Sequence, residues 1–279
     1  MIDRAVEDLV GRALGEDVGL RDVTTEALVE PGRRAQARIV RKQPGMVYGL
    51  EVAQAVFRRL DALIQWRVLE QEGQWRKDAP ANVVELEGDA RALLSGERVA
   101  LNFLGHLSGV ATLTASCAYA LRGTGVEILD TRKTIPGLRL LEKRAVKAGG
   151  GRNHRMGLDD MMLVKENHIA IAGGVGAATR RAIERRPPGC PVEVECRTPD
   201  EVGEAIQAGA DRILLDNMSP SDLRRSVEVA AGRAKLEASG GVTLGTLQEV
   251  AATGIQFISL GALTHSAPAL DLSMTLDAL

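Results

Sequence analysis

The sequence predicts an α/β protein in two parts, an N-terminal third that mixes helices with antiparallel strands and a remainder built from repeated strand–helix units. Six short apolar stretches lie between residues 126 and 260, and successive stretches end 21 to 35 residues apart. This spacing leaves room for a helix after each strand, so it favours parallel strands. Six such strands are fewer than the eight of a complete (β/α) barrel. The first third shows no such repeat, which favours an α+β arrangement.

Composition bounds the class of protein. The chain has 279 residues, of which 45% are hydrophobic and 26% charged, as in an ordinary globular protein. It has neither a signal-peptide core nor an apolar run of about 18 residues, which predicts a cytoplasmic protein without a membrane partner. Three cysteines without CxxC spacing favour neither disulfides nor a zinc site. A pI of about 6.2 and 3% aromatic residues argue against nucleic acid as a partner.

The elements of the first third follow from periodicity and turn residues. Apolar residues at helical spacing predict a helix over 2–14, and a polar turn follows over 15–25. Residues 35–40 alternate as a strand before the turn signal Pro44-Gly45, and a short strand follows at 46–48. The same reasoning predicts a helix over 50–60 and strands at 64–68 and 83–86.

A long helix is predicted next, over 96–121, with Ser95 as its N-cap. Arg98 lies in its first turn, and spacing alone favours an exposed surface charge there. The parallel strands then follow at 126–129, 162–164, 192–194, 212–215, 235–238 and 256–260.

Each parallel strand ends in polar residues or glycines. In barrels of parallel strands the catalytic groups lie at these carboxyl ends, where the loops converge. A single charged strand end could be a surface accident, but six in succession favour a functional site. The strand ends carry Asp130, Arg132 and Lys133, then Lys165, Glu195, Asp216 with Asn217, Ser239 with Gly240 and Gly241, and Gly261.

The segment 130–168 is a local basic cluster. It contains nine Lys or Arg and five Asp or Glu, a net charge of +4 in a chain of net charge −2. Such a cluster favours a pocket for a small anion rather than a long polyanion. A solvated basic helix between two strands is the simpler alternative.

The residue types suggest two anionic substrates. Glycines 240 and 241, with an expected helix over 244–251, can present N–H groups to a phosphate. Glu195 and Asp216 suit a hydrated Mg²⁺, although a buried ion pair with Lys165 is the alternative. A cationic set can hold carboxylates. Its members are Arg132, Lys133, His154 and Arg155. A phosphosugar with pyrophosphate character and a small polycarboxylate fit this combination.

These motifs together resemble the quinolinate phosphoribosyltransferase family, the carboxylating nicotinate-nucleotide pyrophosphorylases of NAD biosynthesis. The resemblance covers essentially the whole chain and depends on the combination of motifs. They are DTRKT at 130–134, GGGRNHR at 149–155, KENH at 165–168, EVE at 193–195, LDNM at 215–218, EASGG at 237–241 and LGALTHS at 260–266. Glu166 and the stretch 196–198 depart from the family pattern, and the second of these departures bears on details of the ribose side.

The resemblance implies a fold and an assembly. An N-terminal α/β sandwich domain, residues 1–104, is joined by the C-terminal tail, 267–279, and packs beside an incomplete α/β barrel, 105–266. The family forms homodimers in which one subunit's N-terminal domain closes the other's barrel mouth. Arg98 would then act in trans, in the partner's active site.

The resemblance also implies a reaction and residue roles. Phosphoribose passes from phosphoribosyl pyrophosphate to quinolinate with Mg²⁺, and decarboxylation gives nicotinate mononucleotide, pyrophosphate and CO₂. Arg98, Arg132, His154 and Arg155 would bind the quinolinate carboxylates, while Lys133 and Lys165 would bridge both substrates. Glu195 and Asp216 would hold the ribose hydroxyls or Mg²⁺, directly or through water. The 5-phosphate would lie on Ser239, Gly240, Gly241 and Gly261.

Two other interpretations remain open from the residues. A Schiff-base aldolase could use Lys165 at a strand end, but it leaves the cluster of Arg132, His154 and Arg155 unexplained. A relative that only binds an anion would need no catalysis. The resemblance implies that such relatives depart from the Asn-His-Arg pattern, which is intact at residues 153–155 of this chain.

Overall fold

The computed structural model describes residues 3–279, which form two compact units. The first comprises the chain up to Ala115 together with Pro136–Gly149 and Ala267–Leu279, and the second comprises Ser116–Ile135 and Gly150–Ser266. Residues 105–115 and 136–149, which the sequence assigned to the barrel domain, therefore group with the first unit. The part of the chain that is described has no helix with the length and apolar character to cross a membrane.

The first unit is built on a four-stranded antiparallel sheet. Its strands are β1 (Arg34–Arg41), β3 (Gln65–Val68), β5 (Ala81–Asp89) and β12 (Leu272–Ala278), in the order β12-β1-β5-β3. The tail strand β12 pairs with β1 along its whole length, from Ala35 opposite Ala278 to Arg41 opposite Leu272. A second small sheet pairs β2 (Gly45–Met46) with β4 (Trp75–Arg76).

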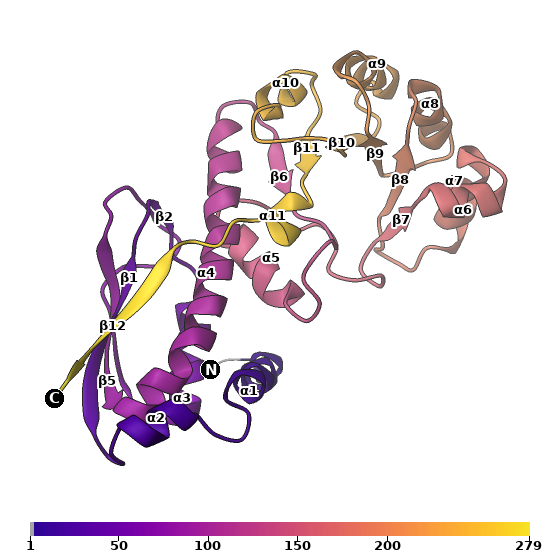
Figure 1. The fold of residues 1–279 in the computed structure, drawn as a ribbon. Helices are drawn as coiled ribbons and strands as arrows, with labels where there is room; N and C mark the ends of the chain where they lie inside the picture. The colour runs from indigo at the N-terminus through magenta and orange to yellow at the C-terminus, as the bar shows by residue number, and fades with distance from the viewer. Residues whose placement is uncertain (1–2) are drawn as a thin grey trace. The chain divides into compact units, whose positions relative to one another are not determined.

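The helices of this unit are α1 (Arg4–Val18), α2 (Val23–Leu28), α3 (Leu50–Leu60) and α5 (Arg139–Ala148), together with most of the long helix α4 (Ala90–Ala120). The predicted bounds of α3 are confirmed, and Ile2 of the first predicted helix lies outside the described residues. Figure 1 shows the C-terminal tail running beside α4 before it enters the sheet. The Leu270 amide donates to the carbonyl of Gly105 at 2.9 Å, which fixes the tail on the helix.

Two predictions for this region are wrong. Residues 15–25 are not one polar turn, because α1 continues to Val18 and α2 begins at Val23. The Asp22 side chain caps α2 by accepting from the Thr25 amide at 2.9 Å. Ser95 is not an N-cap either, since α4 begins at Ala90 and the Asp89 carboxylate accepts from the Ala92 amide. The Ser95 hydroxyl instead donates to Asp22 at 2.9 Å, a partner distant in sequence.

The second unit contains the six predicted parallel strands. They are β6 (Glu127–Leu129), β7 (Met162–Val164), β8 (Val192–Cys196), β9 (Arg212–Asp216), β10 (Lys235–Ser239) and β11 (Phe257–Ser259), in the order β6-β11-β10-β9-β8-β7. The helices between them are α6 (Glu166–Ala172), α7 (Val175–Arg185), α8 (Pro199–Gln207), α9 (Pro220–Ala230) and α10 (Leu247–Ala251), and α11 (Ala262–His265) follows the last strand.

Side-chain alternation along these strands separates the two faces of the sheet. Val192, Val194, Ile213 and Leu215 are fully buried, and they belong to the face that α7, α8 and α9 cover (Figure 1). The alternate residues of these strands point to the opposite face of the sheet. They include Glu193, Glu195, Arg212 and Asp216. Because a strand turns successive side chains to opposite faces, the same strands supply both an apolar core and a polar inner face.

Candidate active site

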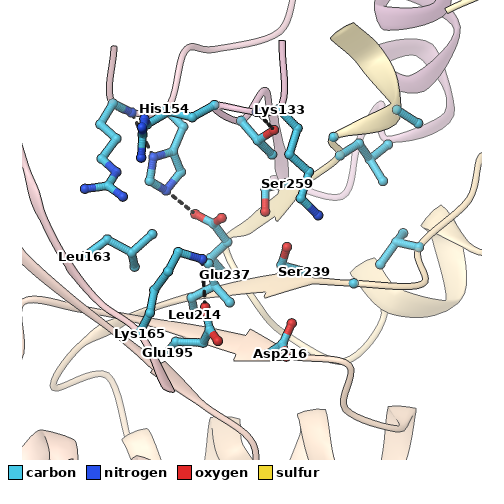
Figure 2. A pocket seen from close by; sticks show the side chains of 18 of the residues that line it. Lys133, His154, Leu163, Lys165, Glu195, Leu214, Asp216, Glu237, Ser239 and Ser259 are labelled. Carbon is cyan, nitrogen blue, oxygen red and sulfur yellow. Dashed lines mark hydrogen bonds and ion pairs between the residues drawn. The ribbon is translucent and has the colours of Figure 1, made fainter. Parts of the chain in front are cut away.

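A pocket of about 510 Å³ lies at the carboxyl ends of the six parallel strands. Its volume is in the range usual for small-ligand sites. Figure 2 shows Lys133 and His154 facing Lys165, Glu195 and Asp216 across this pocket. Arg98 is not among its lining residues. It lies exposed on α4 in the first unit. The other predicted site residues all line it: Arg132, Lys133, His154, Arg155, Lys165, Glu195, Asp216, Ser239, Gly240, Gly241 and Gly261.

The glycines of the pocket allow the main chain to pass where no side chain fits. Gly240 and Gly241 have φ angles of 86° and 64°, in the region that favours glycine. A Cβ atom on Gly240 would lie 2.3 Å from Oδ1 of Asn217, and one on Gly261 would lie 3.0 Å from Cδ of Lys133. Bare main chain at both positions can approach a phosphate group closely.

The helix expected directly after this loop begins later than predicted. The α10 helix starts at Leu247, not at residue 244, and has five residues. A turn occupies the intervening segment, in which the Thr246 amide donates to the Thr243 carbonyl at 3.0 Å. The glycine loop therefore lines the pocket without the α10 N-terminus, so the predicted phosphate site there has only the main-chain amides of the loop to offer.

Cationic side chains also line the pocket, and Lys133 among them lies against Gly261. Burial and the neighbouring Arg132 both lower the pKa of Arg155. The Arg155 guanidinium also donates to the Met161 carbonyl at 3.1 Å, which restrains it. The Lys133 carbonyl accepts from the Thr264 hydroxyl at 2.6 Å and the Lys133 amide donates to Thr131, which fix the loop after β6. Like charges held this close favour binding of an anion that relieves their repulsion.

The two predicted metal-binding carboxylates lie at neighbouring strand ends. Glu195 Oε2 lies 3.0 Å from Lys165 Nζ, with the Glu195 side chain 10% exposed and that of Lys165 49% exposed. The ion pair raised as an alternative is thus present, although its lysine is open to solvent. Asp216 accepts from the Asn217 side chain at 3.0 Å and lies 3.7 Å from Arg197 Nε. Two carboxylates on one pocket wall fit a hydrated Mg²⁺, which prefers oxygen ligands.

Arg197 links the two positions at which the sequence departs from the family pattern, Glu166 and the stretch 196–198. Its guanidinium forms an ion pair with Glu166 as well as lying close to Asp216. The side chains of Arg197 and Glu166 are 55% and 53% exposed, so the pair lies at the rim and contributes little stability.

Sequence reasoning did not assign a role to three charged residues at the floor of the pocket, of which Glu237 lines it. Glu193 and Glu237 are fully buried, and Arg212 lies between them. Burial, followed by the charge of Glu193, raises the pKa of Glu237 to about 7. A signal was present in the sequence, because Glu193 and Glu237 each stand two residues before a predicted site residue and so share its face of the sheet. His265 also lines the pocket.

A parallel α/β sheet with a glycine loop and clustered cations at its carboxyl end is the arrangement of an α/β enzyme with a pocket for anionic ligands. Family models extend this conclusion. "Quinolinate phosphoribosyl transferase, N-terminal domain" matches residues 22–108, and the corresponding "C-terminal domain" matches residues 110–275. The chain belongs to the quinolinate phosphoribosyltransferase family.

Individual relatives agree with the family models. The "Probable nicotinate-nucleotide pyrophosphorylase [carboxylating]" of Bacillus subtilis is 42% identical over 259 residues, which cover 93% of this chain and 89% of the relative. "Quinolinate phosphoribosyltransferase [decarboxylating] 2, mitochondrial" of Nicotiana glauca is 40% identical over 98% of this chain and 82% of its own length. The crystal structure of NadC from Streptococcus pyogenes superposes with a TM-score of 0.94 at 39% identity, covering 100% of this chain and 99% of that one.

Proposed function

We propose that this protein transfers phosphoribose from phosphoribosyl pyrophosphate to the ring nitrogen of quinolinate with decarboxylation. The products are nicotinate mononucleotide, pyrophosphate and CO₂, and the reaction belongs to de novo NAD biosynthesis. The observation that carries the proposal is a single pocket at the carboxyl ends of the six parallel strands. This pocket combines a glycine loop, a cationic wall and two carboxylates. Family membership supports the same assignment.

The cationic wall suits the two carboxylates of quinolinate. Arg132 and Arg155 would bind them, since a guanidinium can donate two parallel hydrogen bonds to one carboxylate. Lys133 and Lys165 would lie between the two substrates as point charges. His154 was predicted to join the arginines, and in this structure its ring is occupied by protein partners.

The glycine main chain and the two carboxylates suit the phosphoribosyl group. Main-chain amides of Ser239, Gly240, Gly241 and Gly261 would hold the 5-phosphate, since glycine lets the main chain approach closely. Glu195 and Asp216 would hold the ribose hydroxyls, or Mg²⁺ through water. Mg²⁺ bound with the diphosphate would neutralise negative charge on the leaving pyrophosphate. The carboxylates would also stabilise positive charge as it develops on the ribose.

Decarboxylation then needs little from the protein. Once the ring nitrogen carries the ribose it is positively charged. The electron pair of the bond to the 2-carboxylate moves to carbon 2, CO₂ leaves, and carbon 2 takes up a proton. The protein mainly has to hold quinolinate and phosphoribosyl pyrophosphate in the orientation in which they react. No nucleophilic side chain is required.

The proposal includes an assembly and a location. The protein would act as a homodimer in the cytoplasm, with Arg98 of one subunit reaching the quinolinate side of the other subunit's pocket. The exposure of Arg98 on α4 is compatible with a contact of this kind.

A coupled assay tests the reaction. Purified protein with Mg²⁺ and phosphoribosyl pyrophosphate is given quinolinate or, in parallel, nicotinate, and CO₂ and mononucleotide are followed together. We expect turnover of quinolinate with both products and little turnover of nicotinate. Turnover of nicotinate alone would contradict the assignment of the carboxylate-binding residues, and binding of quinolinate without turnover would favour an anion-binding protein. An aldolase is disfavoured because Lys165 is paired with Glu195 rather than desolvated.

A further inference from the structure

A compact charged cluster on three adjacent strands forms part of the floor of the pocket, which Glu237 lines. It consists of Glu193 on β8, Arg212 on β9 and Glu237 on β10. Arg212 Nε lies 3.1 Å from Glu193 Oε1, and its guanidinium also contacts the Glu237 carboxylate. The same guanidinium stacks over the Phe257 ring, 4.0 Å from the ring centroid. Packing on one side and two carboxylates on the other hold Arg212 in one place.

The cluster contacts the imidazole of His154. His154 Nε2 lies 2.9 Å from Glu193 Oε2 and 3.6 Å from Glu237 Oε2, and the His154 side chain is only 6% exposed. Figure 2 shows the ring pointing at Glu237 on the floor of the pocket. The edge of the ring that carries Nε2 is therefore turned toward the buried carboxylates.

The other ring nitrogen holds the main chain of the next residue. His154 Nδ1 accepts a hydrogen bond from the Arg155 amide at 2.8 Å, so Nδ1 carries no proton and the ring proton is on Nε2. The His154 amide in turn donates to Oδ1 of the fully buried Asp130 at 2.8 Å. Two successive amides of this loop are thus fixed by buried or nearly buried side chains.

The hydrogen bond that Nδ1 accepts describes a neutral His154 ring, and the charges of the cluster are compatible with it. With a neutral ring, Arg212 balances one carboxylate, and the second carboxyl group must hold a proton for the cluster to be neutral. The titratable groups that face Glu237 are Glu193, Arg212 and His154. Burial and Glu193 raise the pKa of Glu237 to about 7, which fits Glu237 as the proton carrier.

We propose that Glu193 and Arg212, with Glu237, are positioning residues that hold the His154 ring, and that the ring holds the Arg155 main chain so that the Arg155 side chain faces the substrate. His154 then acts on the substrate through Arg155 rather than as a direct ligand of a carboxylate. The kinetic part of this inference rests on the proposed function, whereas the structural part does not.

The first test measures hydrogen exchange of the Arg155 amide by NMR in the full-length protein. Glu193→Gln and His154→Asn should each speed this exchange by about 10-fold or more, since each removes a support of the hydrogen bond. Glu70→Gln is the matched control, because Glu70 forms a buried ion pair with Arg41 in the other unit. Unchanged exchange in both pocket variants would overturn the inference, even if the wild-type protein proved inactive on quinolinate.

The second test separates positioning from general damage. In Glu193→Gln the KM for quinolinate should rise by about 10-fold to 100-fold, while the KM for phosphoribosyl pyrophosphate changes little. The double variant Glu193→Gln/His154→Asn should be no worse than the poorer single variant, because both act through one contact. Additive effects would overturn the inference and assign His154 a contact of its own.

A bound metal is the rival explanation of the cluster. Ligand atoms of His154, Glu193 and Glu237 lie within 4.8 Å of one another. The Arg212 guanidinium contacts both carboxylates and disfavours a further cation there. Calorimetric titration of the wild-type protein with Zn²⁺ decides the question. Zn²⁺ binding that disappears in Glu193→Gln would overturn the positioning role, and equal titrations of the two proteins would support it.

Discussion

At the scale of single residues, Gly240 is the most constrained position of the pocket loop. Its φ is 86°, and a Cβ at this position would lie 2.3 Å from Asn217 Oδ1, so there is no room for a side chain. We expect Gly240→Ala to raise the KM for phosphoribosyl pyrophosphate by about 10-fold to 100-fold, because the loop main chain must move. Steady-state kinetics with each substrate varied in turn measure this.

Gly245→Ala is the control for that prediction. Gly245 lies in the same loop with an ordinary φ, and a Cβ there would meet only Thr243 Oγ1 at 3.9 Å. Its kinetics should match the wild type. If both variants behave alike, the main chain at Gly240 does not hold the phosphate.

Glu237 makes stability depend on pH. Its pKa is raised from 4.5 to about 7, so the folded protein retains a proton that the unfolded chain loses between these values. The stabilising contribution is complete below pH 4.5 and is lost as the pH rises to about 7. Relative to the wild type, the free energy of unfolding of Glu237→Gln should therefore gain up to about 3 kcal/mol between about pH 5 and 8. Urea unfolding of both proteins across this pH range measures the difference in free energy. If the two free energies of unfolding change with pH in parallel, the raised pKa of Glu237 is refuted.

At the scale of elements, the contact between α4 and the C-terminal tail depends on glycine. A Cβ on Gly109 would lie 2.1 Å from the main-chain oxygen of Pro268. Gly109→Ala should lower the free energy of unfolding by about 1–3 kcal/mol, since main chain must shift. Gly15→Ala in α1 has nothing within 4 Å and should instead stabilise by about 0.5–1 kcal/mol. Thermal unfolding of both variants decides, and an unchanged Tm for Gly109→Ala would contradict the contact.

Helices and strands were predictable from the sequence where the spacing of apolar residues alone decides them. The bounds of α3 and the existence of all six parallel strands followed from apolar spacing, because each strand has one face against helices. The roles of Ser95 and Asp22 were missed because these residues lie 73 positions apart, and no local pattern reveals the hydrogen bond between them. The late start of α10 was missed because the turn at Thr243–Thr246 depends on its own hydrogen bonds.

The part of the site that lies at the carboxyl ends of the parallel strands was predictable from the sequence. The rule that parallel strands end at one edge brought Lys165, Glu195 and Asp216 together correctly. It did not reveal that His154 contacts Glu193 and Glu237, because His154 lies in a loop and strand alternation says nothing of where a loop side chain points. Nor did it reveal that Arg212 lies between Glu193 and Glu237, because that depends on the order of β8, β9 and β10 in the sheet.

At the scale of the whole molecule, the proposed trans role of Arg98 can be tested by mixing inactive variants. Arg98→Ala and Lys165→Ala are co-expressed so that mixed dimers form. If Arg98 acts in the partner's pocket, one site of each mixed dimer carries both changes and the other carries neither, which restores up to about one quarter of wild-type activity. No restoration in isolated mixed dimers would place Arg98 in its own subunit's site or outside the site altogether.

The fate of one carboxylate tests the proposed reaction most directly. Quinolinate labelled with ¹³C in its 2-carboxyl group is incubated with phosphoribosyl pyrophosphate, Mg²⁺ and the purified protein, and labelled CO₂, pyrophosphate and nicotinate mononucleotide are quantified together. We expect equal amounts of all three, with no label left in the mononucleotide. Pyrophosphate release without labelled CO₂, or a product that keeps the label, would contradict the proposed function.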